Sequence, residues 1–353
     1  MSRLKSSYIK LTQWEHWPTY MFYVPLIPYF ILSALKAKHP VYYLAVNPAI
    51  KYSGNGTESK FETLEIIPDI YKPKSVLIRE DTPFDLILKT IDKSGITYPL
   101  IVKPDIGFRG YLVKRISTKE ELATYFKKNN ITTIIQEFIN YDNECGIFYH
   151  RMPGNNQGKI TSITLKKFLK VKGDGVSTLS ELINNDSRAF LYIDLLQNIH
   201  GNKLNTVPEN NEVITLSVIG NHSKGTQFIN GNHLNDKELE AAFDRITKDF
   251  EGWYYGRLDI KYDSFEKLKK GEAFKILELN GIISEPTHIY DPSKTNYFKA
   301  LKSIKAHWDI IKDISLKNHR VNHIEYPKVI PYLKDILWLR KHAKKLKRLN
   351  RSN

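Results

Sequence analysis

The segment from residue 257 to residue 280 constrains this chain more than any other. Two apolar-alternating runs joined by polar residues predict a β-hairpin. Because residues two apart on a strand share a face, Arg257 and Asp259 point to one side, and so do Glu278 and Asn280. Strand pairing then groups oxygen ligands that suit Mg²⁺ carrying substrate phosphates, beside an arginine suited to a phosphate oxygen. The alternative is an exposed strand face with solvated acids.

Two upstream segments carry groups that suit a nucleotide. Residues 98–113 predict a buried strand that ends at Lys103, then a glycine-containing turn and a second strand. A lysine at a strand end can meet nucleotide phosphates, and glycines let backbone amides approach them closely. The segment is not a P-loop, because Gly-Lys-Ser/Thr is missing and no helix follows the turn directly. Residues 134–139 predict a strand that runs toward Glu144, as in an adenine hinge with a ribose-binding acid.

Taken in this order, these features resemble the ATP-grasp superfamily, whose members make an acyl phosphate from a carboxylate and ATP and pass the acyl group to a nucleophile. The resemblance covers residues 66–292. It implies an α/β (α+β) fold that holds the nucleotide between two α+β subdomains, with a short N-terminal α/β region and a basic C-terminal helix. The expected boundaries are 1–70 for the aromatic-rich N-terminal region, 71–140 for the small ATP subdomain, 141–325 for the large subdomain with the metal site, and 326–353 for the basic tail.

The resemblance also implies roles for individual residues. Lys103 looks like the lysine that binds the α- and β-phosphates, under a flexible loop that includes Gly107, Arg109 and Gly110. The other expected nucleotide contacts are Gln136, Glu137, Phe138 and Ile139 at the hinge, Glu144 at the ribose, and Lys167 and Asn221. The Mg²⁺ ligands are expected to be Asp259, Glu278 and Asn280, with Mn²⁺ as a substitute metal and Arg257 as the transition-state arginine.

One further motif narrows the branch, and two departures limit the resemblance. Residues 166–179 are similar to the basic strand and Gly-Asp-Gly-x-Ser-Thr turn of the peptide-ligase branch, which favours amide ligases over kinases. The usual upstream nucleotide lysine has no clear counterpart, since Lys72 and Lys74 lie in a turn-like run. The glycine loop carries Phe108 and Arg109 where many ligases have small serines.

Two clusters are candidates to border the acceptor. Residues 280–288 follow directly on the predicted metal strand, so their side chains are expected near the γ-phosphate. Glu285 or His288 is a candidate to take a proton from an amine nucleophile, and a structural turn is the alternative. Residues 218–226, which include Asn221, are expected to form a strand and turn with two glycines, and the corresponding region of similar ligases borders the phosphate or acyl phosphate.

The remaining pattern predicts a buried strand at residues 40–50 and six helices, at 61–67, 84–93, 118–128, 180–185, 187–199 and 236–250. The chain of 353 residues is long enough for two or three lobes. Its single cysteine, Cys145, excludes an internal disulfide and fits a reducing cytoplasm. The excess of 15 positive charges permits nucleic acid, but no such binding motif is present, so we expect no nucleic-acid partner.

Both ends of the chain favour a membrane surface. Residues 14–37 are aromatic and apolar over nearly the length of a membrane span, but three prolines argue against one straight spanning helix. The two interpretations are a helix lying in the membrane interface and a helix packed against the large lobe. Residues 332–353 predict a basic amphipathic helix that suits anionic headgroups, or a solvated tail. The expected location is cytoplasmic, peripheral on the inner face of the membrane.

These inferences predict an ADP-forming ligase that joins a small-molecule or lipid-linked carboxylate to an amine. Two alternatives stay open, a kinase on the same scaffold that phosphorylates a small molecule and a membrane-associated binding module with a degenerate ATP site. A homodimer is also kept open. No motif identifies the carboxylate or the amine substrate, and substrate identity does not follow from the fold.

Overall fold

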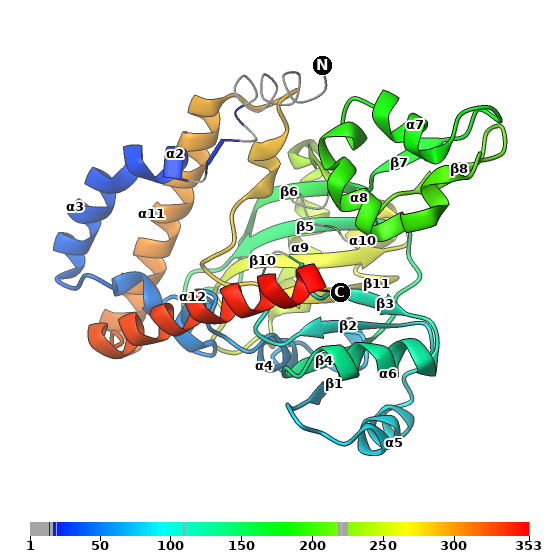
Figure 1. Cartoon of the computed structure of the whole chain (residues 1–353). Coiled ribbons are helices and arrows are strands. Elements are labelled where there is room, and N and C mark those ends of the chain that lie inside the picture. Colours follow the sequence, from blue (N-terminus) through cyan, green and yellow to red (C-terminus); the bar gives the residue numbers. More distant parts are fainter. Residues whose placement is uncertain are drawn as a thin grey trace.

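The computed structural model describes residues 14, 17–18, 20–108, 110–217, 220 and 225–352. Two antiparallel sheets, each covered by helices on one face, lie one above the other, and a helical region flanks them (Figure 1). Every strand pair is antiparallel. The predicted mixed α/β class with two α+β subdomains is therefore confirmed.

The small lobe is a four-stranded sheet in the order β1-β4-β2-β3. Its strands are β1 (Ser75–Ile78), β2 (Leu100–Pro104), β3 (Lys114–Ile116) and β4 (Thr133–Glu137), and its helices are α5 (Phe84–Ser94) and α6 (Lys119–Lys128). Thr118 caps α6 by accepting a hydrogen bond from the Glu121 amide. Both helices bury apolar side chains against one face of the sheet, which leaves the other face free to line a cavity.

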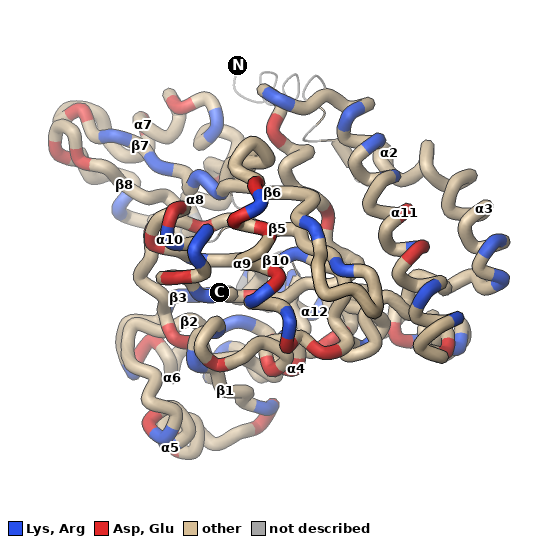
Figure 2. Tube along the Cα trace, turned by 180° about the vertical axis from the view of Figure 1, so that it is seen from behind, with Lys and Arg blue, Asp and Glu red and all other residues tan. Residues whose placement is uncertain are grey.

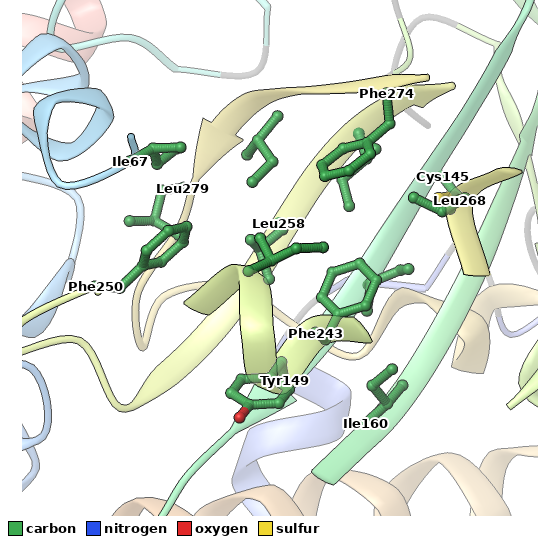
Figure 3. Packing of buried hydrophobic residues seen from close by; sticks show 14 of the residues in the cluster. Ile67, Cys145, Tyr149, Ile160, Phe243, Phe250, Leu258, Leu268, Phe274 and Leu279 are labelled. Carbon is green, nitrogen blue, oxygen red and sulfur yellow. The ribbon is translucent and has the colours of Figure 1, made fainter. Parts of the chain in front are cut away.

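The large lobe is a five-stranded sheet in the order β11-β10-β5-β6-β9. Its strands are β5 (Asn143–His150), β6 (Lys159–Lys167), β9 (Gln227–Asn230), β10 (Tyr255–Tyr262) and β11 (Phe274–Leu279), and its helices are α9 (Lys237–Thr247) and α10 (Phe265–Lys270). Figure 3 shows Phe243 of α9 and Leu268 of α10 packed with Leu258 and Leu279 of the sheet. This core fixes the hairpin, because its alternate residues must then point to the opposite face.

A third, smaller unit follows β6. It contains β7 (Lys170–Lys172), β8 (Val213–Thr215), α7 (Leu179–Asn185), η6 (Ala189–Tyr192), α8 (Ile193–His200) and η7 (Gly201–Asn205). The Gly-Asp-Gly turn leads from β7 to α7, where Thr178 and Glu181 form a reciprocal capping box. The unit has its own apolar core.

The N-terminal region and the long helix α11 form the flank. Their elements are α2 (Tyr20–Tyr23), η2 (Val24–Leu26), α3 (Ile27–Ala37), η3 (Tyr42–Ala45), η4 (Lys51–Ser53), α4 (Lys60–Glu65), η5 (Asp69–Tyr71), η10 (Thr287–Tyr290) and α11 (Tyr297–Val321). The short helix η9 (Asn232–Leu234) follows β9 and belongs to the large lobe. The strand predicted at residues 40–50 is wrong, since the buried part is the 3₁₀ helix η3. The Asn47 side chain instead accepts from the amides of Tyr254 and Tyr255 and anchors this segment beside β10.

The described part of the aromatic segment from residue 20 to residue 37 packs on one side only. Phe22 and Leu26 are buried in a cluster with Ile289 and Ile304, whereas the opposite side of α2 and α3 is exposed. The segment Tyr20–Ala37 is long and apolar enough to cross a membrane by length and composition, with 22% of it buried. A 3₁₀ turn interrupts it at Val24–Leu26.

The predicted C-terminal helix is present as α12 (Val329–Ser352). In Figure 1 it runs from the N-terminal flank toward the small lobe. Tyr332 near its start is buried with Val41 and Leu44, and Leu346 near its end is fully buried in the small-lobe core. These apolar residues contact the protein itself, so the helix joins the flank to the small lobe.

Candidate active site

One continuous cavity of 1720 Å³ lies between the two sheets and extends to the N-terminal helices. Three regions of the chain line it. The small lobe contributes Lys103 and Gln136, the large lobe contributes β10 and β11, and the flank contributes aromatic side chains. The exposed faces of both sheets therefore meet in a single site.

The hairpin residues gather on the cavity side of the large sheet. Asp259 lies opposite Glu278 in the register of β10 and β11, and the Asn280 amide donates to the Arg257 carbonyl at 2.9 Å. We call the side chains of Arg257, Asp259, Glu278 and Asn280 the β10–β11 ring. Two nitrogens of Arg257 donate to the two carboxylate oxygens of Asp259, each at 3.1 Å, and Asn280 Nδ2 donates to Asp259 Oδ2 at 3.2 Å. The predicted grouping is therefore present.

Two lysines that the sequence analysis did not select pair with this ring. Lys166 Nζ lies 2.7 Å from Glu144 Oε1 and 3.1 Å from Asp259 Oδ1, and Lys60 forms an ion pair with Glu278. Burial raises the pKa of Asp259, but the charges of Arg257 and Lys166 outweigh it and hold that pKa below its ordinary value. The ring is thus a set of ionised carboxylates compensated by cations.

The donor set of the ring fits a hard divalent cation. The carboxylates of Asp259 and Glu278 lie at paired strand positions, with the Asn280 side chain hydrogen-bonded to Asp259. Mg²⁺ is usually held by one or two carboxylates plus substrate phosphates. The Lys60 ammonium on Glu278 shows that positive charge is stabilised at this place. Within the described residues, no group of three or more His, Cys, Asp or Glu side chains is arranged to hold a metal, so the fit depends on Asn280 and on phosphate oxygens.

Lys103 reaches from the small lobe to the large lobe. Its Nζ atom donates to Gln136 Oε1 at 3.0 Å and to the Leu277 carbonyl at 3.1 Å. Burial, together with the nearby charge of Lys60, lowers the pKa of Lys103 to about 7. Lys103 therefore lies in the cavity, beside the β10–β11 ring.

The expected hinge lies at the end of β4. Gln136 and Glu137 belong to the strand, and both they and the next two residues, Phe138 and Ile139, line the cavity. Glu137 Oε2 accepts from the Lys74 amide at 3.1 Å, and the Glu137 amide donates to the Lys74 carbonyl at 2.8 Å. The predicted hinge residues are therefore brought together at the edge of the cavity.

Several other predicted residues fall beside or outside this arrangement. Glu144 lines the cavity, where its carboxylate accepts from Lys166. Gly107 and Gly110 line it as well, and Gly110 has a φ of 69°, which favours glycine. Arg109 and Asn221 lie outside the described residues.

Two of the predicted site residues do not reach the cavity. Lys167 is exposed and Lys166 is the cavity-lining residue, because successive strand residues point to opposite faces. His288 is 8% exposed, its Nδ1 lies 2.7 Å from Ser162 Oγ, and it is absent from the cavity wall. Burial lowers the pKa of His288 to about 4. The position of Lys167 does not support the predicted contact with the nucleotide, and the position of His288 does not support the predicted role as a base.

Glu285, the other candidate base, does line the cavity. Its carboxylate accepts hydrogen bonds from the hydroxyl groups of Tyr23 and Tyr290. Its backbone carbonyl accepts from Arg257 Nη1 at 3.4 Å. Glu285 therefore lies next to the ring, at the start of the aromatic part of the cavity.

The order of elements and the site agree with the architecture expected from the sequence. Two α+β lobes face each other across a cavity, with a small-lobe lysine opposite a carboxylate and arginine ring on the last hairpin of the large lobe. This is the arrangement that the resemblance to the ATP-grasp superfamily implies.

Solved structures similar to this chain include three ligases. A bifunctional glutathione synthetase from Pasteurella multocida is 15% identical over 71% of this chain and 36% of its own, with a TM-score of 0.38. The VanG D-Ala:D-Ser ligase from Enterococcus faecalis is 14% identical over 75% of this chain and 64% of its own, with a TM-score of 0.43. A D-alanine–D-alanine ligase from Bacillus anthracis is 16% identical over 76% of this chain and 70% of its own, with a TM-score of 0.39.

The chain thus spans about a third of the length of the glutathione synthetase and just under two thirds of that of the VanG ligase. No model of a known protein family matches the sequence, and no curated protein matches it.

Proposed function

We propose that this protein is an ATP-dependent ligase that joins a carboxylate to an amine through an acyl phosphate and releases ADP and phosphate. The observation that carries the proposal is the β10–β11 ring facing Lys103 in one cavity. Phosphoryl transfer needs charge neutralisation and positioning more than covalent chemistry from the protein. A ring of this composition supplies both.

The residues take the following roles in this proposal. Lys103 binds phosphate oxygens of ATP, and Arg257 stabilises charge that develops on the transferred phosphoryl group. Asp259, Glu278 and Asn280 hold the divalent cation. When bound, Mg²⁺, or Mn²⁺ in its place, supplies Lewis-acid stabilisation of phosphate charge. Lys60 and Lys166, already paired with the ring carboxylates, keep the site near neutrality before the nucleotide enters.

A kinase on the same scaffold is the competing proposal, since both reactions begin with transfer of the γ-phosphoryl group. The Gly-Asp-Gly turn at residues 173–175 favours the ligase by resemblance. The structure places this turn between β7 and α7. The fate of the phosphate separates the two reactions, because a kinase leaves it on the product.

A screen for amine-dependent ADP release tests the proposal. Amino acids and lipid-linked carboxylates are offered with ATP, Mg²⁺ and a panel of amines. The Glu278→Gln variant should lose ADP formation by at least about 100-fold while it keeps its fold, because one ligand charge is lost and the shape stays. Glu266→Gln, an exposed residue of α10, serves as the control. Full turnover by Glu278→Gln at limiting Mg²⁺ would remove the ring from the mechanism.

We also propose that the protein works at the cytoplasmic face of a membrane. The support is an exposed apolar stripe on α2, η2 and α3, formed by Tyr20, Val24, Ile27, Ile31, Leu32 and Leu35. Figure 2 shows almost no charge along these helices until their end, where Lys36 and Lys38 follow. An apolar stripe with cations at its end suits an anionic lipid surface.

A further inference from the structure

The cavity has two chemically different halves. The half between the sheets is lined by many cations, including Lys103, Lys114, Arg115, Lys166 and Lys261. The half beside the flank is lined by rings, which we call the aromatic arm and define as Tyr23, Phe30, Tyr43, Tyr290 and Trp308. The first half suits a polyanion such as a triphosphate. The aromatic arm has few charged groups, so it suits a ligand, or part of a ligand, that is not a polyanion.

The rings of the arm form a connected wall. Tyr23 stacks on Trp308 with centroids 5.9 Å apart, and Phe30 lies edge-on to Trp308 at 5.8 Å. Phe30 also contacts Tyr43 at 5.6 Å. These rings come from α2, α3, η3 and α11, so segments far apart in the sequence build one apolar surface. An aromatic wall of this kind accommodates an apolar or aromatic body.

A single carboxylate lies at the inner end of this wall. Within the described lining, Glu285 is the one acid beside the arm. Both of its oxygens accept from neutral hydroxyl groups, those of Tyr23 and Tyr290, which orient the carboxylate without cancelling its charge. An ionised carboxylate has about four acceptor positions, so it retains capacity for a cationic donor.

The neighbouring arginine is engaged elsewhere. Arg257 directs Nε and Nη2 to Asp259, and it directs Nη1 to the backbone carbonyl of Glu285. The negative charge of the Glu285 side chain is thus presented toward the rings. Aromatic faces also attract cations. A carboxylate framed by rings is a recognition site for an ammonium group.

We infer that the aromatic arm and Glu285 bind the acceptor as a primary ammonium ion carried on an apolar or aromatic body. This inference rests on the proposed ligase function for its chemical purpose. Glu285 lies next to the β10–β11 ring, because Arg257 of that ring donates to the Glu285 backbone carbonyl. The bound nitrogen therefore lies near the place where an acyl phosphate would form. The ammonium loses a proton to Glu285, the nitrogen lone pair attacks the acyl carbon, and the C–N bond forms. The C–O bond to phosphate then breaks, and phosphate and the proton leave.

Three probes with one body and different charges test the site directly. Phenethylamine, which is cationic at neutral pH, phenethyl alcohol and phenylacetate are titrated into the full-length protein by calorimetry, without ATP. We expect phenethylamine to bind about tenfold more tightly than the alcohol, and phenylacetate to bind least, because only the cation gains from the carboxylate and the ring faces. Equal binding of the amine and the alcohol, or binding of none of the three, overturns the inference.

Single substitutions test whether Glu285 is the group that binds phenethylamine. Glu285→Gln should weaken phenethylamine binding about tenfold and leave the alcohol unchanged, and Tyr23→Phe, which keeps the ring and removes one orienting hydroxyl, should weaken it about threefold. Asp313→Asn on α11, an exposed acid outside the cavity wall, is the matched control. Near-ultraviolet circular dichroism verifies that each variant is folded. An equal loss in Glu285→Gln and Asp313→Asn contradicts the assignment.

The binding test and the activity test can fail separately. If the ammonium probe binds through Glu285 while no amide forms with any substrate, the ligase proposal is wrong and the amine site stands. If amide formation is found and Glu285→Gln leaves the KM of every accepted amine unchanged, the ligase proposal stands and the amine site is wrong.

Discussion

The Lys103 ammonium group donates to the backbone carbonyl of Leu277 at 3.1 Å, across the cavity that separates the two lobes. Lys103 lies one residue before the end of β2 in the small lobe, and Leu277 precedes the ring residue Glu278 on β11 of the large lobe. The Lys103 side chain therefore contacts both lobes, and it does so at the place where we expect the triphosphate to bind.

Lys103→Ala should weaken ATP binding by about 10- to 100-fold and adenosine binding by less than about threefold, because the lost partner is the charge on the phosphates. Calorimetry with both ligands measures the difference. Lys119→Ala, an exposed lysine at the start of α6, controls for the change in net charge. Equal losses for ATP and adenosine would mean that Lys103 has a structural role.

The lowered pKa of Lys103 predicts proton uptake on ATP binding. With a pKa of about 7, caused by burial and by the charge of Lys60, Lys103 is mostly neutral in the free protein at pH 8. A bound triphosphate favours the charged form, so the pKa rises and a proton is taken up. Calorimetry at pH 8 in two buffers of different ionisation enthalpy should show an uptake that Lys103→Ala reduces. The same proton count in both proteins would contradict this account.

The hairpin could be predicted because strand periodicity alone places Arg257 and Asp259 on one face, opposite the core residue Leu258. The place of Lys60 in the site could not be predicted, since its pairing with Glu278 joins positions far apart in the chain and no local pattern marks it. The choice between Lys166 and Lys167 depends on the face that β6 presents, and no periodicity at its basic end reveals that face.

Other outcomes depended on packing. His288 follows the ring strand closely in sequence, but η10 turns its side chain into the large lobe. The segment at residues 40–50 is apolar enough for a buried strand, yet its polar groups bond to η4 and β10 through Ser53 and Asn47. Helices α5, α6 and α9 were predictable because their apolar residues recur at helical spacing and, for α6 and α9, Thr118 and Asp236 cap them.

The packing of α12 predicts a measurable stability difference within one helix. Leu346→Ala should lower the free energy of unfolding by about 3 kcal/mol, because the side chain is fully buried in the small-lobe core. Leu337→Ala, at a position that is 57% exposed, should change it by less than about 0.5 kcal/mol. Urea unfolding measures both. Equal effects would show that the end of α12 does not dock on the small lobe.

The exposed stripe predicts binding to lipid vesicles. The double variant Ile31→Glu/Leu35→Glu should lose most flotation with anionic vesicles, because it places charge on the apolar face. Ile70→Glu changes an isoleucine on η5 that is also exposed and lies outside the stripe, and it serves as the control. Truncation of α12 is a poor test, since Leu346 supports the small lobe. Full-length protein that never floats, at low or high salt, would contradict the membrane proposal.

The fate of carboxylate oxygen tests the central claim most directly. Once the screen identifies a carboxylate substrate, it is supplied with ¹⁸O in the carboxyl group, together with ATP, Mg²⁺ and the amine. Attack of that carboxylate on the γ-phosphorus transfers one of its oxygens to phosphate. The account predicts inorganic phosphate that carries one ¹⁸O for each amide formed, with ADP as the nucleotide product. Phosphate that stays on the product, or unlabelled phosphate beside a labelled amide, would contradict a ligase that acts through an acyl phosphate.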